Sequence, residues 1–149
     1  MNEELAEILH REELVLADIK KRALAFTIDE FLLSFIFIFA IGDSFSKAEN
    51  IEALIALINN FTLEYMIIKI MYQSFFVMQY GATIGKLAMK IRVIEIRTVA
   101  NPNILVSLNR AIFRIISELL FYLGFLWGIL NPNRQTWHDL TAKTLVVNA

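Results

Sequence analysis

The residues whose types and spacing could do chemistry are ionisable and amide side chains placed inside long apolar blocks. Asp29 lies about seven residues beyond Arg22, and Lys69 lies near the middle of another block. An ionisable group at the centre of a membrane-spanning helix costs about 2.5 kcal/mol or more, so such groups face protein or water and often mark transport paths. Burial and charged partners also shift pKa values towards neutrality, which suits proton relay. The candidate polar path comprises Asp29, Glu64, Lys69, Gln73, Arg110, Arg114 and Glu118.

The same charges could instead be static, and two pairings stay open. Seven residues is close to two helical turns, so Arg22 and Asp29 share one helix face. They form either a structural ion pair or a functional site built on the Asp29 carboxylate. Lys69 needs a counter-charge from another helix, Asp29 or Glu118, because Glu64 is five residues away and points elsewhere. That pair is either a proton relay or a static ion pair that holds the helices together.

Other kinds of site are excluded by residue type and spacing. The chain has no cysteine, which excludes thiolate catalysis and Cys-based metal sites, and only His10 and His138 could supply imidazole. A net charge of −1 provides no polybasic field for nucleic acid. The segment from Gly81 to Leu87 is too short between its glycines for a phosphate-binding loop, and His138 beside Asp139 has no activated nucleophile. We therefore expect no enzyme, no metal site, no cofactor and no nucleic-acid partner.

The composition indicates a membrane protein. Of 149 residues, 57% are hydrophobic and 19% are charged, with a mean hydropathy of +0.56, whereas soluble domains are about 45 to 50% apolar and about 25% charged. The apolar excess lies in three blocks at residues 23–41, 61–80 and 104–130. The first two are about as long as the 20 residues needed to cross a bilayer. A charge-rich segment precedes the first block, so we expect that block to remain as a span and not to be cleaved as a signal peptide.

The distribution of basic residues predicts the orientation. Basic residues precede the first block (Lys20 to Arg22) and follow the second (Lys86 to Arg97). The intervening loop at residues 42–60 carries Asp43, Glu49 and Glu52 against one lysine, Lys47. By the positive-inside rule, both basic flanks are cytoplasmic. We therefore expect a multi-pass protein of the plasma (inner) membrane with a cytoplasmic N-terminus.

The third block has two interpretations. Its 27 residues would measure roughly 40 Å as one helix, enough for one tilted span, but Gly124 and Gly128 favour a broken, re-entrant helix. Arg110, Arg114 and Glu118 follow each other at intervals of four and form one charged stripe, on a helix that Ser107 could cap. Such a helix lies at the membrane interface or lines a cavity.

The remaining segments complete the predicted fold. Residues 1–20 carry apolar side chains at helical spacing among acidic ones, which predicts a cytoplasmic amphipathic helix. Residues 91–96 fit a short strand, for which Leu145 to Val147 could be the partner if both lie on one side of the membrane. The expected fold is an all-α membrane protein, a small bundle of two full spans plus a third span or re-entrant helix, with a short cytoplasmic two-stranded element.

Three segments together resemble the RDD family of small integral membrane proteins, and the resemblance covers roughly residues 21–147. The first runs from Arg22 to Asp29, the second is Gly-Ala-Thr-Ile-Gly-Lys at 81–86 leading into Ile-Arg-Val at 91–93, and the third is Arg-Gln-Thr-Trp-His-Asp at 134–139 with Thr144 beyond it. The resemblance implies that Arg22, Asp29 and Asp139 are the signature residues. It assigns the cytoplasmic turn to Gly81, Thr83, Gly85, Lys86, Arg134, His138 and Thr144.

The resemblance implies no established activity, although cation/proton exchange has been proposed for the family. We expect a non-catalytic membrane scaffold or accessory subunit, whose partners are the lipid bilayer and either a second copy of the chain or another membrane protein. The alternative is a small oligomeric secondary transporter that exchanges cations for protons through a path lined by Asp29, Lys69 and Glu118. The chain departs from the family pattern at Lys143, where glycine is common, and at Lys69, an unusual mid-membrane cation.

Overall fold

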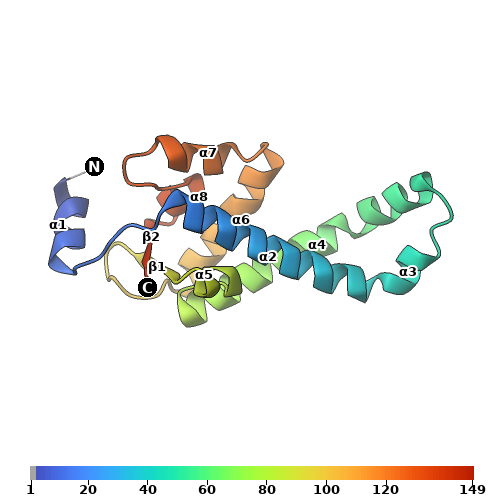
Figure 1. Cartoon of the computed structure of the whole chain (residues 1–149), viewed down its shortest axis with the longest axis horizontal. Helices are drawn as coiled ribbons and strands as arrows, with labels where there is room; N and C mark the ends of the chain where they lie inside the picture. Colours follow the sequence, from blue (N-terminus) through green and yellow to red (C-terminus); the bar gives the residue numbers. More distant parts are fainter. Residues whose placement is uncertain (1–2) are drawn as a thin grey trace.

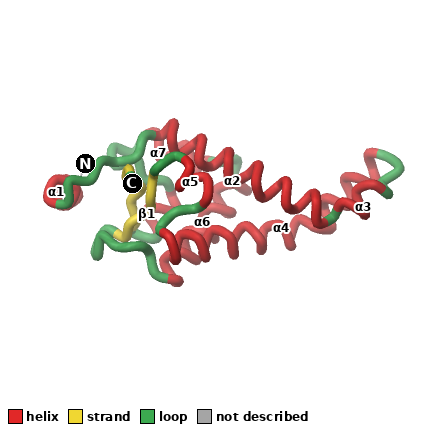
Figure 2. Tube along the Cα trace, turned by 60° about the horizontal axis from the view of Figure 1, so that its bottom comes forward, coloured by secondary structure: helices red, strands yellow, loops and turns green. Residues whose placement is uncertain are grey.

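The computed structural model describes residues 3–149 as an elongated helical bundle that carries a small sheet at one end (Figures 1 and 2). Two long helices, α2 and α4, lie side by side with the short helix α3 at their shared tip, and the other elements lie towards the opposite end, where the sheet is. In chain order the elements are α1 (Glu3–Arg11), α2 (Ile19–Ala40), α3 (Gly42–Ser46), α4 (Ile51–Tyr80), α5 (Ile84–Ala88), β1 (Ile91–Glu95), α6 (Ile104–Leu119), α7 (Leu123–Leu130), α8 (Trp137–Thr141) and β2 (Thr144–Asn148).

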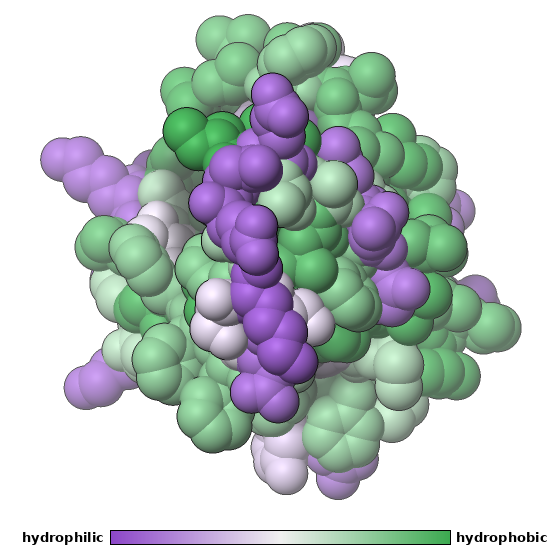
Figure 3. Space-filling view, turned by 90° about the vertical axis from the view of Figure 1, so that its right-hand side faces the viewer, coloured by the Kyte–Doolittle hydropathy of each residue, from purple (hydrophilic) through white to green (hydrophobic). Residues whose placement is uncertain are grey.

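Helices α2 and α4 are both long and apolar enough to cross a membrane. The first matches the predicted span closely, but α4 has 30 residues and begins ten residues before the predicted start at position 61. Its N-terminus is capped by Asn50, whose side-chain oxygen accepts a hydrogen bond from the backbone N–H of Ala53 at 2.8 Å. Much of the expected loop is therefore helical. At the tip between the two helices, hydrophilic side chains form a band surrounded by hydrophobic surface (Figure 3).

The third apolar block is a bent pair of helices. Helices α6 and α7 meet at 103°, and the break contains Phe121 and Tyr122 with φ of 54° and 61°. The arms have 16 and 8 residues, about 24 and 12 Å, so neither alone crosses a hydrocarbon core of about 30 Å. A single straight third span is therefore wrong. The N-cap of α6 is Asn103, whose side chain accepts from Val106 N at 3.0 Å, and the predicted cap, Ser107, instead bonds the Pro102 carbonyl.

The short sheet shows at which end of the bundle the chain enters and leaves the α6–α7 pair. Strand β1 pairs antiparallel with β2 from Ile91 opposite Asn148 to Glu95 opposite Thr144, which confirms the predicted pairing. Because β1 follows α4 closely and β2 follows α8, the chain on both sides of the α6–α7 pair lies at the same end of the bundle (Figure 2). The bent pair therefore begins and ends towards the same end of the bundle, which is the arrangement that the re-entrant alternative predicts.

The N-terminal segment differs from the predicted helix over residues 1–20. Helix α1 ends at Arg11, and the chain then continues in an extended conformation, with Leu16 bridging to Val147 of β2. The sheet supplies backbone partners that a continuous helix would forgo, such as the Val146 carbonyl that accepts from Ala17 N at 2.9 Å. Leu5 of α1 is buried against the sheet. The apolar residues predicted to share one helix face are thus divided between a helix and an edge strand.

Apolar side chains cover the outside of the bundle, and charged ones lie inside it. Phe31, Phe35 and Phe39 on α2 are exposed to 75%, 73% and 83%, whereas Arg110 and Arg114 on α6 are only 3% and 4% exposed. The charged stripe of α6 thus faces protein and not the membrane interface, because α6 packs on α4 and α8. This arrangement suits a bundle in lipid, where charges must find partners within the protein.

Candidate functional site

The first polar cluster is built on Asp29, which is fully buried on α2. One carboxylate oxygen accepts from the Tyr72 hydroxyl at 2.7 Å and from the backbone N–H of Gly85 at 2.8 Å, and the other accepts from the Thr83 hydroxyl at 2.6 Å. Charge-assisted bonds of this kind are the stronger class of hydrogen bond. Asp29 therefore ties α2 both to α4 and to the turn that ends in α5.

Gly85 allows this close approach because it lacks a side chain. A Cβ at this position would collide with the carbonyl oxygen of Ala25 and would lie 2.9 Å from Cγ of Asp29. The turn before it depends on Gly81, which ends α4 in the left-handed region with φ of 68°. The predicted tight turn at residues 81–86 is therefore present, and its glycines serve backbone geometry and helix contact.

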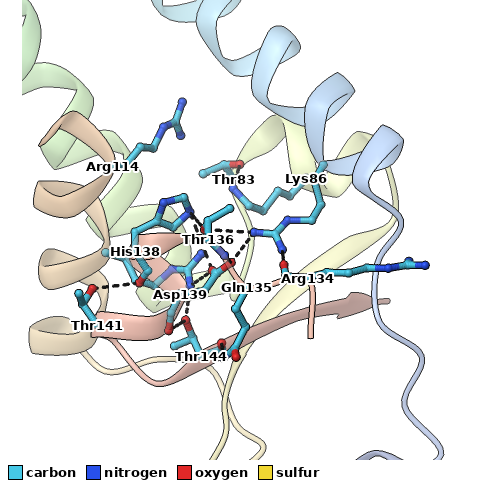
Figure 4. A network of polar contacts seen from close by, with 12 residues as sticks. Thr83, Lys86, Arg114, Arg134, Gln135, Thr136, His138, Asp139, Thr141 and Thr144 are labelled. Carbon is cyan, nitrogen blue, oxygen red and sulfur yellow. Dashed lines mark hydrogen bonds and ion pairs between the residues drawn. The ribbon is translucent and has the colours of Figure 1, made fainter. Parts of the chain in front are cut away.

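The second cluster is built on Asp139 of α8, which is also fully buried. Its carboxylate pairs with Arg22 of α2 and with Arg110 of α6, the latter at 2.5 Å. It also accepts from the backbone N–H and the hydroxyl of Thr136 at 3.0 and 2.8 Å, which completes the capping box of α8 (Figure 4). Although burial raises its pKa, attraction by Arg22 and Arg110 holds the pKa of the Asp139 carboxyl well below its ordinary value.

The remaining members of the predicted cytoplasmic turn surround Asp139. The Arg134 carbonyl accepts from Arg22, and the Thr144 hydroxyl accepts from Arg110 (Figure 4). The His138 ring contacts the Thr136 hydroxyl at 3.0 Å. Burial lowers the pKa of His138 well below its ordinary value, so the ring is neutral at pH 7. These contacts join the start of α2, α6, α8 and β2 at one point.

The third cluster is a closed ring of four charges deep in the bundle. Lys69 of α4 pairs with Glu30 of α2 at 3.0 Å and with Glu118 of α6. Arg114 of α6 pairs with the same two carboxylates, Glu30 at 2.8 Å and Glu118 at 3.1 Å. Two cations and two anions thus balance. Each charge has two opposite partners, which is the arrangement that makes buried charges tolerable.

The pairings expected from the sequence were only partly right. Glu118 is a partner of Lys69 as predicted, but Asp29 is not, since its carboxylate is turned towards α5. The predicted pairing of Arg22 with Asp29 is also wrong, because Arg22 reaches Asp139. Glu30, which lies outside the candidate polar path, completes the ring. The sequence feature that points to Glu30 is its position next to Asp29 within the same apolar block.

The seven residues of the candidate polar path do not form one continuous line. Lys69, Arg114 and Glu118 belong to the ring, whereas Asp29 and Arg110 belong to the two other clusters. Glu64 is exposed on α4, away from the ring. Gln73 is buried, and its side-chain nitrogen has no hydrogen-bond partner within residues 3–149. Nor do three His, Asp or Glu side chains gather as a metal site anywhere in that described range.

Comparison with known proteins agrees with the three resembling segments. The sequence model of the RDD family matches residues 16–143. The match covers most of the chain, so the chain belongs to the RDD family. No curated protein and no solved structure gives a match.

Proposed function

We propose that this RDD-family chain is a non-catalytic membrane scaffold or accessory subunit, in which the signature charges fasten the sheet-bearing end to the spans. The observation that carries the proposal is the pairing of Asp139 with Arg22 and Arg110. Arg22 and Asp139 are 117 residues apart in the chain, so their contact joins two elements from distant parts of the sequence, α2 and α8. A charge used in this way supports a structural role for the signature.

The second signature carboxylate supports the same role. Asp29 accepts three hydrogen bonds, one of them from the backbone of Gly85, so its carboxylate is fully used in holding α2 to α4 and α5. The mid-bundle ring is likewise neutral and closed. A cation/proton exchanger that used these charges would have to open one of the pairs in each cycle, at the cost of leaving a largely buried charge unpaired.

The proposal includes an orientation and a partner. We propose that the chain lies in the plasma (inner) membrane with the sheet-bearing end in the cytoplasm. The orientation rests on Lys20, Lys21 and Lys90 at that end, whereas the opposite tip carries Asp43 and Glu49 with one lysine, Lys47. A second copy of the chain or another membrane protein would dock on the bundle or on the sheet-bearing end.

Two substitutions of Asp29 test the structural role. Asp29→Asn keeps a carbonyl oxygen that can accept from Tyr72 and Gly85, whereas Asp29→Ala leaves three buried donors without an acceptor. We expect the Asn variant to retain most of the wild-type level in membranes and the Ala variant to lose it, since a buried unsatisfied donor costs about 1–3 kcal/mol. Glu64→Gln, an exposed change on α4, is the control and should match wild type.

Proton flux separates the scaffold from the exchanger. The folded proteins are reconstituted in liposomes, and proton movement is followed on addition of sodium, potassium or lithium. A scaffold gives no cation-dependent flux in wild type or variants. Cation-dependent flux in wild type that disappears in a well-folded Asp29→Asn protein would overturn the proposal and identify an exchanger with Asp29 in its path.

A further inference from the structure

A cavity of about 270 Å³ lies between α2, α5 and the α6–α7 pair. Pockets for whole drug-sized ligands measure about 300–1,000 Å³, so this cavity suits a compact group such as a headgroup. The polar side chains at the cavity include Arg22, Gln73, Lys86 and Arg114. No acidic side chain lines it within the part of the chain that the structure describes. The charged side chains that line it are thus basic, but Arg22 and Arg114 already pair with carboxylates outside the lining, which leaves Lys86.

Lys86 is the cation at this cavity that lacks an anionic partner. Its ammonium group contacts the Thr83 hydroxyl at 3.3 Å, and across residues 3–149 it makes no ion pair with a carboxylate. Figure 4 shows its side chain extending towards Thr83, beside the cluster around Asp139. Burial lowers the pKa of Lys86 to about 7, although the Asp29 carboxylate, which accepts from the same Thr83 hydroxyl, opposes the shift. An anion placed in the cavity would raise this pKa further and favour the charged ammonium.

Gln73 provides a second group that lacks a partner. Its side chain is only 6% exposed, it lines the cavity from α4, and within the described residues its nitrogen has no hydrogen-bond acceptor. A buried amide without a partner costs free energy unless a ligand or water satisfies it. An amide N–H₂ and an ammonium group on one cavity both donate to an oxyanion.

An apolar part of the cavity lining is formed by α7 and continues to the outer surface. Phe125, Leu126 and Ile129 of α7 line it. Leu126 and Ile129 are also exposed to 51% and 61%, so the wall reaches the face that lipid chains cover. A ligand that fits both walls carries an oxyanion at one end and a hydrocarbon chain at the other.

We propose that this cavity binds the phosphate of an anionic phospholipid, with Lys86 and Gln73 donating to the phosphate oxygens and α7 packing against the acyl chain. The site goes beyond the scaffold role and does not depend on it. A soluble phosphate ester shares the headgroup chemistry, but it leaves the apolar wall of α7 without a contact. The phospholipid therefore satisfies both walls.

Binding to the purified full-length protein in nonionic detergent tests the proposal. Thermal unfolding and native mass spectrometry are measured with added phosphatidylglycerol, phosphatidylcholine or glycerol phosphate. We expect phosphatidylglycerol to raise Tm and to remain bound, and the other two to have little effect. Lys86→Met should weaken phosphatidylglycerol binding at least about tenfold, because a hydrogen bond to a charged group contributes about 1.5–3 kcal/mol. Gln73→Leu should weaken it too.

Lys20→Met is the matched control. Lys20 is an exposed cation at the start of α2 and does not line the cavity, so its loss should leave binding within about twofold of wild type. Equal weakening by Lys20→Met and Lys86→Met would indicate surface attraction only and would overturn the proposal. Unchanged affinity in both Lys86→Met and Gln73→Leu, or stabilisation by glycerol phosphate without phosphatidylglycerol, would also overturn it.

Discussion

The ring of Lys69, Glu30, Arg114 and Glu118 predicts that charge balance matters more to stability than any single ion pair. Lys69→Met leaves two carboxylates sharing Arg114, with one uncompensated negative charge inside the bundle. Side-chain exposure is 7% for Lys69, 13% for Glu118 and 24% for Glu30, so the uncompensated charge is largely buried. Removing one partner of a buried pair costs about 3–5 kcal/mol, and we expect a loss of that size.

A second substitution should restore most of the loss. Glu30→Gln added to Lys69→Met returns the ring to neutrality and leaves the Arg114–Glu118 pair, which lies on a single helix at 3.1 Å. Glu30→Gln alone should also destabilise, because it leaves two cations facing one carboxylate. Replacing a buried ion pair by neutral groups is often neutral or stabilising. The double variant should therefore lie within about 1 kcal/mol of wild type.

Unfolding in mixed micelles provides the assay. The protein is titrated with a denaturing detergent and followed by the fluorescence of Trp127 and Trp137, with Glu64→Gln as an exposed control on α4. The double-mutant cycle gives the coupling between positions 30 and 69. A Lys69→Met protein as stable as wild type, or a double variant no more stable than the worse single one, would refute the charge-balance reasoning.

Three further predictions concern the turn, the C-terminal junction and pH. Gly85→Ala should lower the free energy of unfolding by about 1–3 kcal/mol, because the added Cβ would clash with α2. Gly42→Ala, whose Cβ would have no atom within 4 Å, should leave it unchanged or raise it. Denaturant unfolding of both variants measures the two changes. Lys143 has φ of 51°, so Lys143→Gly should raise the free energy of unfolding by about 0.5–1 kcal/mol, and no gain would contradict strain there. Because folding lowers the pKa of Lys86 to about 7, the unfolded chain binds more protons between pH 7 and about 10. Stability without added lipid should therefore rise with pH from 7 to 9, by at most about 1.4 kcal/mol per pH unit, and Lys86→Met should flatten this rise; an equal slope in both proteins would exclude Lys86 as its source.

The inverted distribution of polarity explains why so small a bundle can hold so many charges. In water, α6 would expose Arg110 and Arg114 and bury its apolar face, but here these arginines are buried and much of the apolar surface of α6, such as Leu105 and Leu119, is exposed. Lipid is as apolar as a leucine side chain, so moving apolar surface from lipid into the bundle provides no hydrophobic driving force. The charges have no comparable alternative in the bilayer core, and pairing them draws the helices together.

Several features could be predicted from the sequence because they depend on local patterns. The two long spans follow from continuous apolar length, the β1–β2 strands from short apolar alternation, and the glycine turn from residue type. The predicted start of α4 and the predicted end of α1 were wrong. The first depends on the Asn50 cap, and the second on the backbone partners that β2 offers to Leu16 and Ala17.

The sequence by itself thus determined which residues are charged, which blocks are apolar and which glycines are needed. Only the tertiary structure decided which charges meet. Asp29 and Glu30 are neighbours in one span, but successive residues differ by about 100° around a helix. The orientation of α2 about its own axis therefore places Asp29 against Gly85 of α5 and Glu30 against Lys69 of α4. That orientation is set by the packing of all the helices at once, because each buried charge must find its partner on another element.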